Sequence, residues 1–435
     1  MRKIDKIVLI IPPSPWLITD REIPFYGILH IASYLKENSD CEVGVCDLSS
    51  LSKDQWYIPV GDLYGVTGVS PNFIYVRDII EILKKREPDK PVIVGGVHAT
   101  VLPEHILEKT LADACVIGEG EISIQHIVNG LDWQRIPGIV TRKFNTGSPA
   151  LIQDLDILPF PDRKMIDYYS YLPSTLFNYL DTNVKKEGSI FTARGCSFDC
   201  SFCSSKKMHH GKVRFRSAQA VADEVIYMKD EFGVEMINFL DDTFTLDKKR
   251  AYKICELLEK IEMKWFCLVR PDDMDFDLFS AMKKTGCLSV APGFESGSNR
   301  ILKLMNKKIT TDIVRECVKA AYKAGLMING QLIVGFPGET EEDIELTVKL
   351  IKDNPEVDTF GLHTFQPFPG SDVWENPEKY GAVIDKNTDF SDYHSVGNHK
   401  GNYSSDPIID SRFRYLKGII GDKSRELRRK LIHET

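Results

Sequence analysis

Apolar and polar residues follow two different periods along this chain. Short apolar runs rich in Val and Ile alternate with longer segments in which apolar residues recur at three- and four-residue spacing. The first pattern is typical of buried strands and the second of amphipathic helices. In the N-terminal third the predicted strands are Lys6–Ile11, Glu42–Asp47, Leu63–Val69, Pro91–Val94 and Ala114–Ile117, and the predicted helices are Gly27–Lys36 and Val76–Lys85.

This alternation predicts parallel βαβ units, and therefore an α/β fold with an N-terminal doubly wound parallel sheet. Ligands of such sheets bind beyond the carboxyl ends of the strands. The sequence places Pro12–Pro15, Ser70–Phe73, Gly95–Thr100 and Gly118–Glu121 there. It contains no Gly-x-Gly-x-x-Gly motif, which disfavours a nicotinamide cofactor.

The alternation resumes after residue 188. Its strands are predicted at Ser189–Thr192, Met236–Leu240, Trp265–Val269, Leu288–Pro292, Gly330–Val334 and Thr359–Thr364, and its helices at Ala218–Phe232, Lys248–Ile261, Phe276–Thr285, Thr311–Ala324 and Glu341–Asp353. Six such units predict a partial (β/α)6 barrel of the TIM type. Active sites of these barrels lie at the C-terminal ends of the strands.

The predicted domain division follows these patterns. Residues 1–150 form a Rossmann-type domain, 151–187 a linker, 188–375 the partial barrel and 376–435 a C-terminal extension. The linker contains the proline-rich segment Asp154–Asp162. The extension ends in a basic helix predicted at Phe413–Ile432, which we interpret as a solvated face, with a cover over the barrel mouth as the alternative.

Composition narrows the class of protein. The 435 residues carry a net charge of −8, which argues against nucleic acid as the main partner. No apolar run reaches the roughly 18 residues that span a bilayer, and we expect a cytoplasmic protein. Its ten cysteines are then thiols or ligands, not disulfides. Seven are expected in the core: Cys41, Cys46, Cys115, Cys255, Cys267, Cys287 and Cys317.

The remaining cysteines, Cys196, Cys200 and Cys203, form a Cys-x3-Cys-x2-Cys array directly after the first barrel strand. Thiolates are soft ligands that select zinc, copper(I) or iron–sulfur clusters. A structural zinc site would need a fourth ligand, for which His209 and His210 are candidates. A [4Fe–4S] cluster held by three cysteines leaves one iron open for a substrate or cofactor.

Other polar residues and glycines follow the later barrel strands. Adjacent acids such as Asp241 and Asp242 bind metals or are simply solvated. Glu295 is suited to accept hydrogen bonds from a ribose or an ammonium group, and Ser296 to donate one to a carboxylate. The glycine at 335 lets an adenine pack against backbone.

The cysteine array, preceded by Arg194-Gly195 and interleaved with Phe198 and Phe202, closely resembles the signature of radical S-adenosylmethionine (SAM) enzymes. The resemblance implies that the open iron binds the amino and carboxylate groups of SAM. Electron transfer then cleaves SAM to a 5′-deoxyadenosyl radical. The residues implied at SAM are Asp241, Asp242, Arg270, Glu295, Ser296 and Gly335, and no catalytic residue is identified beyond these.

Residues 5 to 145 resemble the cobalamin-binding domain that precedes the radical SAM domain in one large subfamily. Gly95–Thr100, Pro103-Glu104 and Ile117–Glu121 carry this resemblance. The residues implied at cobalamin are Ser70, Asn72, Gly95, Gly96, His98, Thr100, Gly118 and Glu119.

The lower face of cobalt is expected to lack a histidine, because Pro12–Pro15 follow the first strand. The cobalt-ligand motif Asp-x-His-x-x-Gly occurs only at 392–397, far from that position. His98 is expected to line the nucleotide-tail pocket or to cap a turn.

Both resemblances together predict a cobalamin-dependent radical SAM enzyme that methylates an unactivated carbon of a small metabolite through the 5′-deoxyadenosyl radical and methylcobalamin. The alternative is a radical SAM dehydratase, epimerase or cyclase, including one whose cobalamin domain no longer binds B12. A third reading is a non-catalytic iron–sulfur or zinc module. The expected partners are the substrate and a reductant such as flavodoxin or ferredoxin.

Overall fold

The computed structural model describes residues 2–14, 17, 19–173, 184–273, 275–391, 393 and 407–434. The chain separates into two compact units. Unit 1 comprises Met1–Thr175, Lys207–His210 and Lys386–His394, and unit 2 comprises Leu176–Lys206, Gly211–Asp385 and Ser395–Thr435. A short C-terminal segment therefore belongs to the N-terminal unit.

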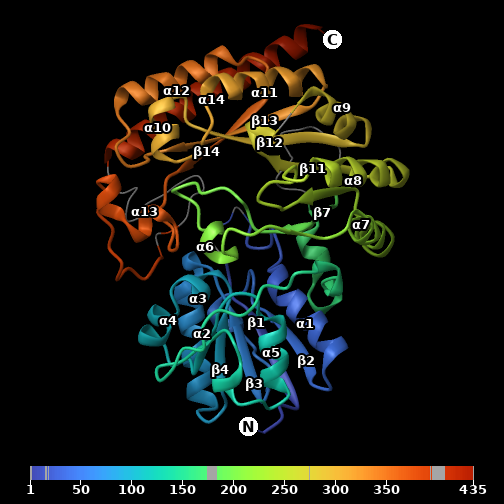
Figure 1. Cartoon of the computed structure of the whole chain (residues 1–435), viewed down its shortest axis with the longest axis vertical. Coiled ribbons are helices and arrows are strands. Elements are labelled where there is room, and N and C mark those ends of the chain that lie inside the picture. The colour runs from blue at the N-terminus through green and yellow to red at the C-terminus, as the bar shows by residue number, and fades with distance from the viewer. Residues whose placement is uncertain are drawn as a thin grey trace. The chain divides into compact units, whose positions relative to one another are not determined.

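Unit 1 is built on a six-stranded sheet in the order β2-β1-β3-β4-β5-β6, drawn in blue to green in Figure 1. The strands are β1 (Lys6–Ile11), β2 (Glu42–Asp47), β3 (Leu63–Thr67), β4 (Val92–Gly95), β5 (Ala114–Val116) and β6 (Ile139–Val140). The first five are parallel, as predicted. A sixth strand that the sequence did not predict, β6, pairs antiparallel with β5 at one edge. Two residues are too short for a periodic signal.

Helices cover both faces of this sheet (Figure 1). They are α1 (Tyr26–Asn38), α2 (Phe73–Arg86), α3 (Val97–Val101), α4 (Pro103–Lys109) and α5 (Gly120–Val128). Side chains of α2, α3 and α4 pack on one face, against alternate strand residues such as Val8, Tyr64 and Val94. Helices α1 and α5 contact each other on the opposite face. The doubly wound arrangement is confirmed.

Unit 2 contains a six-stranded parallel sheet in the order β14-β13-β12-β11-β10-β7. The strands are β7 (Glu187–Ile190), β10 (Met236–Phe239), β11 (Lys264–Val269), β12 (Cys287–Glu295), β13 (Met327–Val334) and β14 (Thr359–Thr364). Because β7 and β14 do not pair, the sheet is open, as a partial barrel requires. The strand β12 is longer than predicted and includes Glu295.

The helices between these strands begin at capping side chains, which explains the accuracy of their predicted bounds. They are α7 (Ala218–Phe232), α8 (Lys248–Ile261), α9 (Phe276–Lys284), α11 (Thr311–Lys323) and α12 (Glu341–Asp353). Ser217, Asp247 and Asp275 each accept a backbone N–H of the first turn of α7, α8 and α9. Each such cap contributes about 1 kcal/mol.

Smaller elements complete the chain. The short helices and strands are α6 (Ser205–His209), α10 (Asn299–Leu304), α13 (Asp372–Glu375), β8 (Ala193–Arg194) and β9 (Arg214–Phe215). The 3-10 helices are η1 (Lys53–Gln55), η2 (Ser70–Asn72), η3 (Trp133–Arg135), η4 (Leu155–Ile157), η5 (Arg163–Met165), η6 (Tyr168–Tyr171), η7 (Pro271–Asp273) and η8 (Pro377–Tyr380). The predicted C-terminal helix is α14 (Pro407–Glu434), which contacts α12, β13 and β14.

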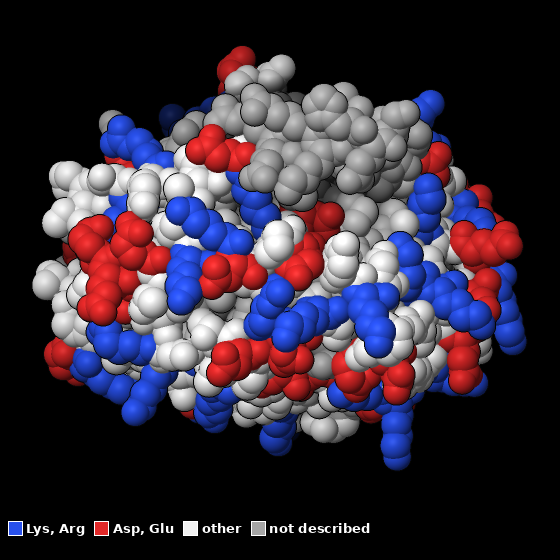
Figure 2. Space-filling view, turned by 90° about the horizontal axis from the view of Figure 1, so that it is seen from above, with Lys and Arg blue, Asp and Glu red and all other residues white. Residues whose placement is uncertain are grey.

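The surface carries charges of both signs. Figure 2 shows Lys and Arg side chains interspersed with Asp and Glu over the described part of the face in view. Within the described ranges, no helix is long and apolar enough to cross a bilayer.

Candidate functional site

The three cysteines of the array lie in the loop after β7, and all are partly exposed free thiols. Each sulfur accepts an N–H group. Cys203 Sγ accepts the backbone N–H of Ser205 at 3.4 Å, and Cys200 Sγ accepts Nη1 of Arg270 at 3.7 Å. The backbone N–H of Phe198 donates a hydrogen bond to the sulfur of Cys196.

Burial raises the pKa of each thiol in the array, to about 12 for Cys203. The neighbouring donors and cations oppose this. N–H···S contacts are what thiolate ligands accept, so the loop fits an iron–sulfur cluster. Among the described residues, no three His, Cys, Asp or Glu side chains are close enough to hold one metal ion. A [4Fe–4S] cluster requires a wider spacing of the three sulfurs, because each thiolate binds a different iron.

The start of the cysteine loop is tied to Asp241, which follows β10 and is 1% exposed. Its carboxylate accepts the backbone N–H groups of Thr192 at 2.6 Å and Ala193 at 3.0 Å, and also the hydroxyl of Thr192. Burial raises the pKa of Asp241, and these hydrogen bonds act in the opposite direction. The structure therefore places Asp241 beneath the loop.

The next residue, Asp242, is exposed, unlike Asp241. Its carboxylate accepts the hydroxyl of Ser205, two residues after the last cysteine. Its charge also raises the pKa of the thiols of Cys196 and Cys203. Asp242 thus lies beside the position that a cluster on this loop would occupy.

Glu295 ends β12 with a left-handed backbone (φ 62°), where the pairing with β13 shifts register. It is 7% exposed, and its Oε1 accepts Nζ of Lys307 at 2.6 Å. The buried hydroxyl of Ser296 accepts the backbone N–H of Ser298 at 3.1 Å. Sequence reasoning missed Lys307, because a lysine in the loop after a short helix gives no periodic or motif signal.

Gly335 follows β13 with φ 85°, and its N–H donates to Oε2 of Glu339 at 2.7 Å. A Cβ at this position would lie 2.7 Å from the side chain of Ile409 in α14. Burial raises the pKa of Glu339 to about 7. The C-terminal helix therefore covers the turn that the sequence assigned to adenine.

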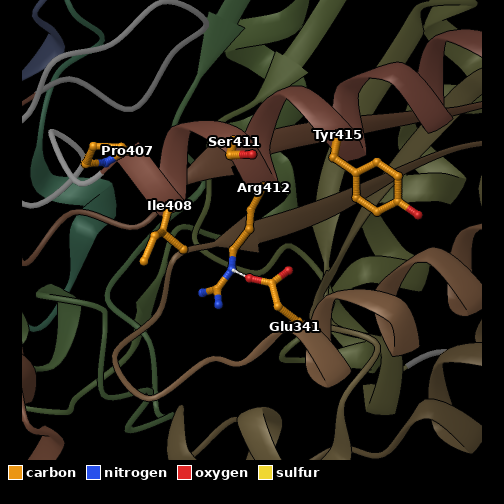
Figure 3. Close-up of a pocket in the computed structure, with 6 residues that line it drawn as sticks. All are labelled: Glu341, Pro407, Ile408, Ser411, Arg412 and Tyr415. Atoms are coloured by element: carbon orange, nitrogen blue, oxygen red, sulfur yellow. Dashed lines mark hydrogen bonds and ion pairs between the residues drawn. The ribbon is translucent and has the colours of Figure 1, made fainter.

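The same helix borders a surface pocket of about 400 Å³. Figure 3 shows Arg412 of α14 directed at Glu341 at the start of α12, and the two side chains form an ion pair at 2.7 Å. Arg412 also donates to the carbonyl of Glu339 at 3.0 Å. The pocket is lined by Glu341, Pro407, Ile408, Ser411, Arg412 and Tyr415.

In unit 1, the residues assigned to cobalamin gather at the carboxyl ends of β3, β4 and β5. The hydroxyl of Ser70 lies 2.8 Å from Nδ1 of His98, and both residues are buried. Asn72 accepts the N–H of Val69 through Oδ1 at 2.8 Å. Its buried Nδ2 has no partner among the described residues and remains able to donate to a ligand.

Glycine is required where these loops meet. Gly96 has φ 90° and ψ −169°, and a Cβ there would lie 2.8 Å from the carbonyl oxygen of Gly68. Gly95 accepts the N–H of Gly68 at 3.2 Å. Thr100 Oγ1 bridges the next loop, donating to the carbonyl of Gly96 and accepting the N–H of Gly118 at 3.0 Å. The loops therefore form a closely packed, glycine-lined backbone cradle at the ends of β3, β4 and β5.

Glu119 binds a segment outside these loops. Its Oε2 accepts the backbone N–H of Ile152 at 2.7 Å, so the carboxylate holds the segment that leaves the sheet.

An aromatic and imidazole cluster that the sequence did not predict adjoins His98. Nε2 of His98 lies 3.1 Å from Nδ1 of His105. The ring of Phe390, from the C-terminal segment of unit 1, lies 4.9 Å from the ring of His98 and 5.2 Å from that of His105. Burial, followed by the charge of His105, lowers the pKa of His98 to about 3. Asp392 and His394 of the C-terminal motif lie outside the described residues.

The two units match two families of known domains. The radical SAM superfamily model matches residues 190–351. A B12-binding domain model matches residues 21–128. The chain is 31% identical over 395 residues to the uncharacterized methyltransferase PH0819 of Pyrococcus horikoshii, a match that covers 86% of this chain and 83% of the relative.

A second relative is the anaerobic magnesium-protoporphyrin IX monomethyl ester cyclase of Rubrivivax gelatinosus, 28% identical over 80% of this chain and 65% of the cyclase. Among solved structures, TsrM of Kitasatospora setae with cobalamin and a [4Fe–4S] cluster matches with a TM-score of 0.70 and 19% identity, over 86% of this chain and 75% of that one. The cobalamin-dependent enzyme OxsB matches with a TM-score of 0.65 and 16% identity, over 91% of this chain and 57% of that one.

The chain is a radical SAM enzyme. Within that superfamily it belongs to the branch with an N-terminal B12-binding domain. Its cofactors are a [4Fe–4S] cluster, SAM and cobalamin.

Proposed function

We propose that this chain is a cobalamin-dependent methyltransferase that adds a methyl group to an unactivated carbon of a small metabolite. The observation that carries the proposal is the presence of two strand-end sites in one chain, a thiolate loop and a glycine-lined cradle. When bound, the cluster and SAM supply the radical, and cobalamin carries the methyl group. The methyltransferase relative supports this outcome.

On the barrel side we propose that Cys196, Cys200 and Cys203 hold the cluster. Asp242 is exposed beside the loop and accepts hydrogen bonds, which supports a role at the SAM ammonium group. Glu295 and Ser296 are proposed at the ribose and carboxylate. Asp241 positions the loop from below. The assignments of Arg270 and Gly335 to SAM remain predictions.

In unit 1 we propose that the cobalamin site is lined by Ser70, Asn72, His98 and Thr100. The glycines at 95, 96 and 118 let the ligand approach backbone. The Nδ2 group of Asn72, for which the described residues provide no partner, supports this role. Glu119 is proposed to shape the site by holding the following segment.

A second candidate function, radical cyclisation with the same cofactors, is favoured by the cyclase relative. Product mass separates the two. Methyl transfer adds one methylene unit to the substrate, whereas dehydration, epimerisation and cyclisation do not.

We also propose a cytoplasmic enzyme with a low-potential reductant such as flavodoxin or ferredoxin. A cluster with an open iron needs a one-electron donor of this kind. The ten free thiols of the structure support a reducing compartment.

The test is anaerobic reconstitution of the full chain with iron, sulfide and cobalamin. We expect visible absorbance from both cofactors and cleavage of SAM to 5′-deoxyadenosine. Protein that takes up a cluster but no cobalamin would contradict methyl transfer. Protein that takes up zinc alone would contradict the whole proposal.

A further inference from the structure

Arg270 is placed against the central cysteine of the array. It follows β11 and is 4% exposed. Its guanidinium lies 3.5 Å from the ring centroid of Phe198, inside the cysteine loop. Stacked in this way, it directs Nη1 at Cys200 Sγ, 3.7 Å away. A guanidinium held on an aromatic ring keeps its charge and a fixed direction.

The other donors of Arg270 are occupied within the protein. Nε and Nη2 bind the two carboxylate oxygens of Asp272 at 2.9 and 3.0 Å. Nη2 also donates to the backbone carbonyl of Lys307 at 2.7 Å. These bonds fix the guanidinium plane from two sides and hold Nη1 within reach of the sulfur.

The loop that supplies this carbonyl also holds the cysteine loop. Asn306 and Lys308 have left-handed backbones, with φ of 50° and 59°. The side chain of Asn306 donates to the carbonyl of Asp199 at 2.6 Å. The N–H of Ser201 donates to the carbonyl of Met305 at 2.9 Å. Such backbone strain persists only where the surroundings determine it, so Arg270 and Cys200 are positioned by one shared set of contacts.

We propose that Arg270 is a positioning residue that raises the reduction potential of the cluster through Cys200. The inference rests on the proposed assignment of the cluster to the three cysteines. Reduction moves one electron from the external donor to the cluster and adds one negative charge, with no bond broken. A buried cation with an N–H···S bond stabilises the state with more negative charge. Removing it therefore disfavours reduction.

The test is a redox titration of the reconstituted full chain, followed by the electron paramagnetic resonance of the reduced cluster. In Arg270→Gln we expect the equilibrium constant for reduction to fall about tenfold, which is a shift of about 59 mV to more negative potential for a one-electron couple. In Asp272→Asn, which removes the charge that neutralises Arg270, we expect a smaller shift of opposite sign. Lys319→Gln removes an exposed cation of α11 and should change nothing.

Several outcomes would overturn the inference. One is an unchanged potential in Arg270→Gln with a full complement of iron. Another is a loss of SAM affinity at unchanged potential, which would place Arg270 at SAM instead. If Arg270→Gln does not retain iron, the direction of the shift in Asp272→Asn decides the question. Absence of a cluster from the unaltered protein would contradict the proposed function itself, which keeps the two failures distinct.

Discussion

The strand-end loops of the two units are held by different kinds of interaction. In unit 2, ionised groups surround the cysteine loop: Asp241 binds its first residues, Arg270 faces a sulfur, and Lys307 pairs with Glu295. In unit 1, the loops after β3 and β4 are joined by backbone hydrogen bonds and by neutral side chains such as Ser70 and His98, although the Glu119 carboxylate binds the segment that follows β5. The difference matches the ligands, because a cluster and SAM bring charge whereas the cobalamin cradle must admit a bulky group closely.

The largest expected effect concerns the cluster ligands. Cys203→Ser replaces a soft ligand by a hard one, and we expect loss of the cluster and of SAM cleavage. Iron analysis and visible absorbance measure this. Cys317→Ala is the matched control, because this buried cysteine of α11 contributes only packing. Equal loss of iron in both variants would contradict the assignment.

In unit 1 the largest effect should come from backbone geometry. Gly96→Ala puts a Cβ against the carbonyl of Gly68 in a conformation that only glycine adopts freely. We expect a loss of about 3 kcal/mol in the free energy of unfolding and at least tenfold weaker cobalamin binding. Urea unfolding and spectral titration measure these. Gly27→Ala, in α1 where nothing lies within 4 Å, should neither lower the free energy of unfolding nor weaken cobalamin binding.

Two hydroxyl deletions compare the units directly. Thr192→Val removes a donor to the buried carboxyl group of Asp241, and we expect a cost of about 2 to 3 kcal/mol, because a buried acceptor loses a hydrogen-bond partner. Ser70→Ala removes a neutral bond to His98, for which about 1 kcal/mol is expected. Urea unfolding of both variants measures the two losses in the free energy of unfolding. Equal losses would contradict the difference between the two units.

The last comparison concerns pH. The pKa of His98 is about 3 in the fold, against about 6.5 when unfolded. At a pH between these two pKa values, His98 is protonated in the unfolded chain but not in the fold. His98 therefore lowers the stability of the fold as pH falls below about 6.5. Each unit well below that point costs about 1.4 kcal/mol. In His98→Gln this slope should disappear. The variant should have a lower free energy of unfolding than the unaltered protein at pH 7.5, and this deficit should be smaller at pH 5.5. A constant deficit would show that the fold does not lower the pKa of His98.

Most elements could be predicted from periodicity and capping chemistry, because both are local. α7, α8 and α12 begin and end where the sequence placed them. The proposed cluster ligands could be picked out for the same reason, since the three cysteines lie within eight residues. Lys307, His105 and Phe390 were not predictable, because each acts across a contact between segments distant in sequence. No local pattern shows that Phe390 packs on His98 in unit 1.

One measurement tests the central claim most directly. The reconstituted full chain is incubated with cobalamin, a low-potential reductant and SAM labelled in its methyl group, and the label is followed. The account predicts that the label leaves SAM and is recovered with the corrinoid. Label that stays entirely in methionine, while 5′-deoxyadenosine forms, would contradict methyl transfer and favour the cyclase-like alternative.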